Sequence, residues 1–308
     1  MKETRTQAMQ TAESDDFLLP LRHMNLIDDF LFDVATVDLE VCKILIELSL
    51  GIQIREIRWK EGQKVIHNLP GRRGIRMDFY VEDDEGRIFD VEMQKRKEGH
   101  VPKRTRFYQA LNDAPLLKSG EKSFDSLKPT YIVIICGFDL YGFGKYRYTF
   151  ENSCNEVPGL KMGDACTKVI LNTKGKNDSE VERSLVDFLH YVAESEASNV
   201  QEDCDERLKR LHKKVNGIKS NRQMGVTYMK MEERDRLIKE SGKAEGEAKK
   251  LIQQICKKMQ KGKTPEQIAD ILEEELGTIL PLYEAAEKCA PEYDLDEIYD
   301  LVRPKDED

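Results

Sequence analysis

Residues 74–94, GIRMDFYVEDDEGRIFDVEMQ, carry the clearest structural signal in this 308-residue chain. Apolar and polar residues alternate on both sides of Asp84-Glu85-Gly86, which is the pattern of two β-strands joined by a short turn. A three-residue hairpin loop commonly ends in a glycine with left-handed backbone. With Gly86 in that place, the register puts Asp78 opposite Glu92 and Tyr80 opposite Asp90. The sequence therefore predicts a β-hairpin with a defined register.

The hairpin register also assigns its two faces. Asp78, Glu92 and Gln94 share one face, and the Cβ atoms of directly opposed residues lie about 4.5–5.5 Å apart. Two carboxylates at that distance repel unless a positive group joins them, and oxygen ligands favour Mg²⁺ or Mn²⁺. The alternative is an ordinary solvent-facing side of a hairpin. The opposite face is apolar and is expected to be core: Met77, Phe79, Val91 and Met93.

Five pieces of sequence, in this order, resemble one known family. Asp78, thirteen intervening residues and Glu92-Met93-Gln94 are similar to the D-x(n)-E-x-K/Q signature of PD-(D/E)XK nucleases. The surroundings resemble one branch, the recombination-promoting nucleases, also called PD-(D/E)XK nuclease family transposases. The resemblance covers about Asp29 to His190. Its pieces are Asp29-Phe30-Leu31-Phe32, Arg76-Met77-Asp78, Val91-Glu92-Met93-Gln94, Lys103-Arg104-Thr105-Arg106-Phe107-Tyr108-Gln109 and Leu117-Lys118-Ser119-Gly120.

This resemblance implies an α/β fold, a restriction-endonuclease-like mixed sheet flanked by helices, with a helical C-terminal appendage. It implies that Asp78 and Glu92 bind the metal, Mg²⁺ or Mn²⁺. Gln94 stands where many relatives have lysine, and an amide carries no charge to help ionise water. Where that step limits the rate, Gln94→Lys is expected to raise activity. The first helix often contributes an upstream acid, for which Asp29 is the first candidate and Glu47 the second.

A basic segment follows the hairpin directly. Residues 95–106, KRKEGHVPKRTR, carry six cations and one anion, although the net charge of the chain is -9. This segment and the helix that it leads into are expected to contact DNA phosphates. The alternative is a solvated basic helix end with Tyr108 in the core. The expected DNA-binding residues are Lys103, Arg104, Arg106 and Tyr108, and a second basic cluster lies at Arg72, Arg73 and Arg76.

The chain is expected to have three parts. Residues 1–19 are predicted to be a disordered N-terminal extension, 20–195 the nuclease-like domain, and 196–308 a charged helical C-terminal region. Within the domain, helices are predicted over 26–51, from Pro102 to about Lys118 and after Ser179, and strands near 52–59, 130–137, 146–151 and 167–171.

The C-terminal region has its own pattern. Residues 241–250 are expected to form a flexible or weakly helical connector. Thr264-Pro265-Glu266-Gln267 is a helix start, with a threonine cap and proline at the first position. That helix is expected to end at Gly277, with another helix over 279–288. The pair resembles a helix-turn-helix, but its second helix is poor in cations, which favours an interaction or dimerisation module and hence a homo-oligomer.

Bulk properties set the remaining expectations. The seven cysteines form no C-x-x-C pair, and no apolar run approaches the length of a membrane span. With no secretory leader at the N-terminus, the protein is expected to be cytoplasmic. The family resemblance implies a Mg²⁺-dependent deoxyribonuclease that acts as an endonuclease on DNA in a recombination or mobile-element setting. The alternatives are a catalytically weak nucleic-acid-binding or protein-interaction module on a nuclease scaffold, and a nuclease acting on RNA.

Overall fold

The computed structural model describes residues 19–62, 65–66, 75–76, 78–97, 100–117, 119–120 and 123–303. The predicted disordered extension up to residue 18 lies outside these ranges, as do Arg72, Arg73, Met77 and Lys118. The chain divides into two compact units, residues 1–228 and residues 229–308. The first unit contains the sheet and the hairpin, so it is the α/β part of the protein.

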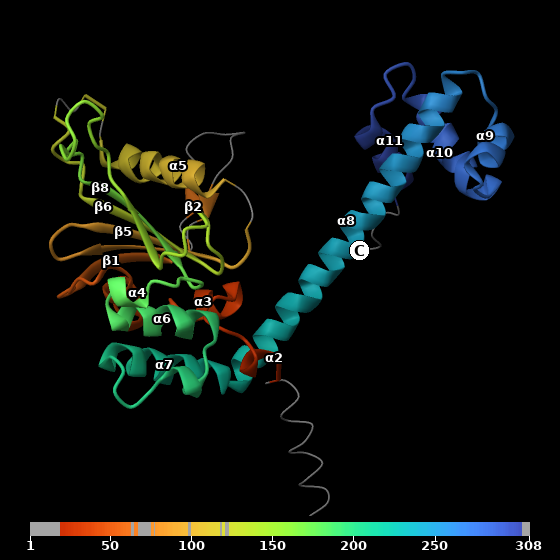
Figure 1. Ribbon diagram of the computed structural model, residues 1–308. Helices are drawn as coiled ribbons and strands as arrows, with labels where there is room; N and C mark the ends of the chain where they lie inside the picture. Colours follow the sequence, from red (N-terminus) through yellow and green to blue (C-terminus); the bar gives the residue numbers. More distant parts are fainter. Residues whose placement is uncertain are drawn as a thin grey trace, which may run out of the picture. The chain divides into compact units, whose positions relative to one another are not determined.

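A mixed six-stranded sheet forms the centre of the first unit (Figure 1). Its strand order is β1-β4-β5-β6-β8-β7, with β5, β6 and β8 parallel and the remaining neighbours antiparallel. A second, two-stranded sheet pairs β2 with β3. The strands are β1 (Ile57–Gly62), β2 (Val65–Ile66), β3 (Ile75–Arg76), β4 (Phe79–Asp83), β5 (Ile88–Gln94), β6 (Thr130–Cys136), β7 (Arg147–Phe150) and β8 (Cys166–Asn172).

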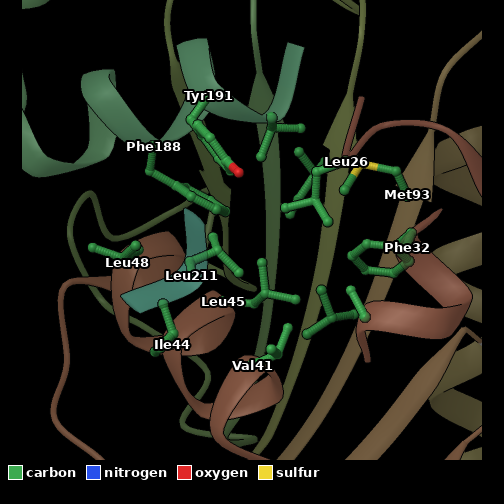
Figure 2. Packing of buried hydrophobic residues seen from close by; sticks show 14 of the residues in the cluster. Leu26, Phe32, Val41, Ile44, Leu45, Leu48, Met93, Phe188, Tyr191 and Leu211 are labelled. Carbon is green, nitrogen blue, oxygen red and sulfur yellow. The ribbon is translucent and has the colours of Figure 1, made fainter. Parts of the chain in front are cut away.

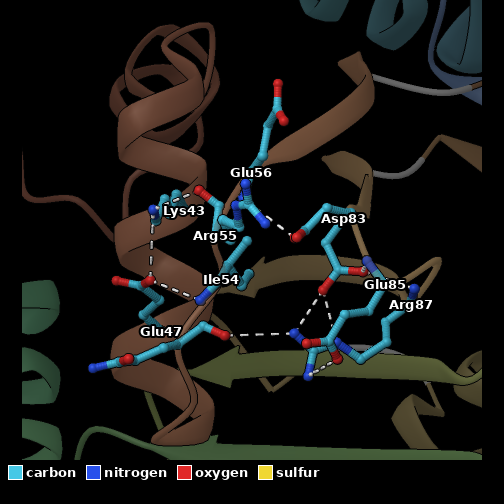
Figure 3. Close-up of polar contacts among 10 residues, drawn as sticks. Lys43, Glu47, Ile54, Arg55, Glu56, Asp83, Glu85 and Arg87 are labelled. Carbon is cyan, nitrogen blue, oxygen red and sulfur yellow. Dashed lines mark hydrogen bonds and ion pairs between the residues drawn. The ribbon is translucent and has the colours of Figure 1, made fainter.

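The β4–β5 hairpin has the register that the sequence predicts. Phe79 pairs with Val91 and Tyr80 with Asp90, and Gly86 has a φ of 78°. The carboxylate of Asp83 holds the turn, because its Oδ1 accepts hydrogen bonds from the backbone N–H groups of Glu85 at 3.0 Å and Arg87 at 2.8 Å (Figure 3). The next pair in this register is Asp78 and Glu92, which brings the two carboxylates to the end of the hairpin.

Four helices cover one face of the sheet. The face carries the odd-numbered residues of the hairpin, among them Phe79 and Val91, and these pack with apolar side chains of the four helices. Figure 2 shows Leu45, Phe188 and Leu211, from three different helices, meeting in this core. The helices are α3 (Asp29–Ala35), α4 (Leu39–Leu50), α6 (Arg183–Ala193) and α7 (Glu206–Lys219), preceded by the short α2 (Leu19–Arg22).

Helix α5 (Val101–Asp113) covers the opposite face. Its Val101, Tyr108 and Leu111 pack against Ile132 and Ile134 of β6. Strand β5 is therefore buried on both sides, and its polar residues are not on a solvent-facing surface. The solvent-facing alternative is thus excluded for this strand.

Helix α5 ends earlier than the sequence predicts. Proline stands at its start as expected, but the helix stops at Asp113 instead of near residue 118. Pro115 explains the difference, because it has no backbone N–H to donate to the carbonyl of Leu111 and the α-helical series of hydrogen bonds cannot continue, although Ala114 before it keeps helical angles. The chain continues as a 3₁₀ turn, Ala114–Leu116; two more such turns are Asp178–Glu180 and Ala197–Asn199.

The boundary between the units does not coincide with the expected one at 195/196. Helix α7 contributes Leu208, Leu211 and Val215 to the core of the first unit, and each is fully buried. Lys219 at its end donates to the carbonyl of Ser195 at 2.9 Å. The Lys- and Glu-rich composition after Ala193 hides this apolar stripe, which follows the spacing of an amphipathic helix.

Of the two expectations for residues 241–250, a flexible or a weakly helical connector, the flexible one is wrong. Helix α8 (Arg222–Met259) runs through it without a break. Gly242 and Gly246 each cost about 1 kcal/mol in a helix, but alanine, glutamate and lysine around them favour helix strongly. The composition of the segment therefore outweighs its two glycines.

The second unit is a small helical cluster. The end of α8 packs there with α9 (Pro265–Leu272), α10 (Leu276–Lys288) and α11 (Leu295–Val302) around buried isoleucines such as Ile255 and Ile298. The capping box between Thr264 and Gln267 is confirmed. The helix does not end at Gly277, which lies inside α10; it ends at Leu272, and Glu273 takes the left-handed conformation.

No helix among the described residues is long and apolar enough to cross a membrane.

Leu211 tests whether α7 belongs to the sheet unit. Leu211→Ala should lower the free energy of unfolding of residues 1–228 by about 2–5 kcal/mol, because it leaves a cavity in the common core. Leu160→Ala, at a leucine that is 53% exposed, is the matched control and should change it by less than about 0.5 kcal/mol. Urea unfolding followed by circular dichroism measures both. An unchanged midpoint for Leu211→Ala would restore the boundary at 195.

Candidate active site

A cleft of about 460 Å³ opens where β5 ends. Acidic side chains from the hairpin and from the start of α3 meet there with basic ones from α5 and the segment after β5. The lining residues are Asp28, Asp29, Asp78, Glu92, Met93, Gln94, Lys95, Arg96 and Arg104. All four residues expected to be catalytic, Asp29, Asp78, Glu92 and Gln94, are among them.

Asp78 is fixed by the hairpin itself. Its Oδ2 accepts a hydrogen bond from the backbone N–H of Met93 at 2.8 Å. This contact ties the residue just before β4 to the end of β5, so the position of the carboxylate follows from the strand register. Since Glu92 precedes Met93, the two acids sit on adjoining strands at the same level of the sheet.

Glu92 is almost fully buried, with 3% of its surface exposed. Its Oε2 accepts from Nη2 of Arg104 at 2.6 Å, a short charge-assisted contact. Its Oε1 is also buried but has no hydrogen-bond partner among the described residues. A buried carboxylate oxygen without a donor is costly, and a cation that reached this atom would relieve that cost.

Gln94 and Tyr108 complete the surroundings of Arg104. Nη1 of Arg104 donates to Oε1 of Gln94 at 2.6 Å, and its Nε donates to the hydroxyl of Tyr108 at 3.1 Å. The guanidinium also lies 5.6 Å from the centre of the Tyr108 ring. The Nε2 of Gln94 donates to the carbonyl of Arg96 at 2.8 Å. Arg104 therefore holds Glu92 and Gln94 of β5 together.

Burial dominates the electrostatics of the two acids. It raises the pKa of Asp78 to about 6, opposed by the Met93 N–H and reinforced by the charges of Asp33 and Asp29. Burial, followed by the repulsion from Asp78, raises the pKa of Glu92 to about 7, and Arg104 opposes both effects. When both groups are ionised, their surroundings offset the two negative charges only in part. A bound cation would offset the rest.

The residues present fit a hard divalent cation. Asp78 and Glu92 offer carboxylate oxygens, including the unpartnered Oε1 of Glu92, and Mg²⁺ is commonly bound through one or two carboxylates with water completing its shell. Among the described residues, no group of three or more His, Cys, Asp or Glu side chains is arranged to hold a metal. The fit therefore rests on two carboxylates, with Asp29 lining the same cleft.

The second candidate for the upstream acid lies elsewhere. Glu47 of α4 is buried and its Oε1 accepts from the backbone N–H of Ile54 at 2.9 Å (Figure 3). Its carboxylate also lies 4.0 Å from Nζ of Lys43 and 3.8 Å from Nη1 of Arg207. Glu47 holds the turn after α4 and does not line the cleft.

Asp28 was missed by the sequence reasoning. It precedes α3, accepts from the N–H of Asn25 at 2.8 Å and pairs with Lys95 across the cleft. The only signal in the sequence was the doublet with Asp29 at a helix start, where acids are common for reasons of capping. Its place in the cleft depends on how α3 packs under β5.

The expected DNA-binding residues divide into two groups. Lys103 and Arg106 are exposed on α5. Arg104 is committed to Glu92 and Gln94, and Tyr108 is only 4% exposed and packs in the core under α5. For Tyr108 the structure favours the core alternative over a phosphate contact, because the helix turns its ring toward β6.

A sequence model of the PD-(D/E)XK nuclease family transposases matches residues 44–255. This range is more than half of the chain and contains Asp78, Glu92, Gln94 and the whole sheet, so the chain belongs to this family. It begins after Asp29 and runs beyond His190, which differs from the range suggested by the short motifs. No curated protein and no solved structure matches the chain.

The raised pKa values predict how stability depends on pH. A carboxyl group whose pKa is raised by folding stabilises the folded state below its ordinary pKa, and that contribution is lost as pH rises through the raised value. Without metal, the free energy of unfolding of Asp78→Asn should therefore rise relative to that of the wild-type chain as pH rises from about 5 to about 8. The expected change in this difference is on the order of 2 kcal/mol. Urea unfolding in EDTA measures the difference. A constant difference would show that Asp78 is not strained by its surroundings.

Proposed function

We propose that this protein is a divalent-metal-dependent endonuclease that hydrolyses phosphodiester bonds in DNA. The observation that carries the proposal is the pair Asp78 and Glu92, held at one level of a buried hairpin and open to one cleft. Membership of a PD-(D/E)XK nuclease family supports it. Mg²⁺ is the expected ion, and Mn²⁺ offers the same preference for oxygen ligands.

Each residue has a role in the proposed reaction. Asp78 and Glu92 would hold the ion, and Asp29 adds a further acid to the cleft. When bound, the ion lowers the pKa of water and stabilises charge on the phosphate. The four acids of the cleft repel a phosphate, and a bound ion would offset that repulsion.

The proposed DNA surface lies beside the cleft. Lys103 and Arg106 are exposed on α5, and Lys95 and Arg96 line the mouth. These cations offset the repulsion between DNA and the acids. Contacts of this kind position the backbone without selecting sequence. For the proposed recombination or mobile-element setting, the support is the description of the family as one of transposases.

One observation favours a second candidate function. Arg104 already occupies Oε2 of Glu92 and the carbonyl of Gln94, and a guanidinium there competes with a metal for the same carboxylate. This arrangement supports a catalytically weak nucleic-acid-binding or protein-interaction module on the nuclease scaffold. Calorimetric titration with Mn²⁺ separates the two candidates, since the second requires no ion.

Replacing either acid tests the enzyme proposal. Asp78→Asn and Glu92→Gln should lower Mg²⁺-dependent cleavage of supercoiled plasmid by roughly 100-fold or more, because each removes a charged ligand. Glu82→Gln is the matched control: Glu82 lies on the same hairpin but pairs with Lys128 at 2.6 Å outside the cleft, and its loss should leave cleavage unchanged. Circular dichroism confirms that all three variants fold.

Two results would contradict the enzyme proposal. One is wild-type protein that cuts no single-stranded, double-stranded or branched DNA with Mg²⁺ or Mn²⁺ and binds neither ion. The other is cleavage that persists in EDTA or in both acid variants. The same assay on RNA of equal length decides between the two nucleic acids.

The exposed cations of α5 make a separate prediction. Lys103→Ala and Arg106→Ala should each weaken DNA binding across sequences and reduce the slope of log affinity against log salt by about one unit. Fluorescence anisotropy in EDTA at several salt concentrations measures this without cleavage. Slopes equal to that of the wild-type chain would place the DNA surface elsewhere.

A further inference from the structure

Arg104 is the most heavily engaged side chain of the cleft. Its three donor nitrogens each have a partner: Nη2 binds Glu92, Nη1 binds Gln94 and Nε binds Tyr108. The side chain of Arg104 is 34% exposed and that of Glu92 only 4% exposed. The attraction within this short ion pair is strong, because water screens it weakly around the buried carboxylate.

The amide of Gln94 has a fixed orientation. Its carbonyl oxygen accepts from Arg104, and its nitrogen donates to the backbone carbonyl of Arg96. Both ends of the amide therefore serve the framework of the site. In this arrangement, Gln94 acts on the cleft through Arg104 and needs no charge of its own.

We propose that Arg104 supplies from helix α5 the positive charge that position 94 lacks, and that Gln94 is the acceptor that holds it there. By binding Oε2 of Glu92, the guanidinium orients the carboxylate and leaves Oε1 without a protein partner. Arg104 is thus a positioning residue for Glu92. The activity measured below depends on the proposed nuclease function, but the charge pairing does not.

The packing of α5 supports this role. Arg104 and Tyr108 are one helical turn apart, and the tyrosine ring is buried against β6. The ring limits where the guanidinium can lie, and supporting contacts of this kind commonly tune a ligand by 10–100-fold. A phosphate contact, the role that the sequence suggests for Arg104, would require it to give up these partners.

The expected effect of a lysine at position 94 then differs from the one that the family signature suggests. A lysine there would remove the acceptor of Nη1 and add a second cation beside the first. We therefore expect Gln94→Lys to impair the site when Arg104 is present. When Arg104 is replaced by an uncharged residue, the same lysine can take over its charge.

A double-mutant cycle tests the inference: Arg104→Met, Gln94→Lys and the two together. Methionine keeps an unbranched apolar stem and removes the guanidinium. In EDTA, Arg104→Met should lower the urea midpoint because Glu92 loses its cation, and Gln94→Lys should lower it because two cations lie side by side. The double variant should recover the wild-type midpoint. Arg210→Met, on an exposed arginine of α7 whose Nε lies 3.7 Å from Glu40, is the control and should keep the wild-type midpoint.

Cleavage adds the functional measurement. Arg104→Met should reduce the single-turnover rate at saturating DNA by about 10–100-fold and change DNA affinity by less than about twofold. The double variant should return to within about tenfold of the wild-type rate. A phosphate-binding role for Arg104 predicts the opposite division, with weaker DNA binding and an unchanged rate at saturation.

The outcomes separate the two proposals. In the double variant, the two midpoint losses could simply add and the two rate losses simply multiply. That result would overturn the inference that Arg104 supplies the positive charge that position 94 lacks. A wild-type chain that does not cut DNA would overturn the nuclease proposal alone. In that case the urea midpoints in EDTA still decide whether Arg104 supplies the positive charge that balances Glu92.

Discussion

The burial of β5 on both faces is the constraint on which the site depends. Helices α3, α4, α6 and α7 cover one side and α5 covers the other. Because Glu92 lies in the middle of this sandwich, it has lost most of its water, and its charge must be balanced by nearby groups. Arg104 provides one balancing charge, and the cleft provides room for another.

The same burial explains why Asp78 and Glu92 behave as a unit. Asp78 is tied to β5 by the N–H of Met93, so it cannot move away from its neighbour. Burial raises the pKa of both carboxyl groups, and the charge of Asp78 raises that of Glu92 further. A cation bound between them would lower both pKa values. The hairpin therefore stores a repulsion that ligand binding can release, at some cost to the stability of the metal-free protein.

The helical parts of the chain show how composition can mislead. The charged segment after Ala193 contains α7, whose leucines complete the main core. It also contains α8, which continues through Gly242 and Gly246. In both cases, a high content of lysine and glutamate describes the exposed side of a helix and says little about which unit its apolar side joins.

The sequence alone determined the hairpin, its register and the pairing of Asp78 with Glu92. These follow from the alternation of neighbouring residues and from the left-handed Gly86, which are local properties. Only the tertiary structure decided that Arg104 and Gln94 bind one another, that Asp28 and Asp29 line the cleft and that the first unit extends to residue 228. Those contacts join distant elements, and they depend on which side chains share the same volume once the helices have packed on the sheet.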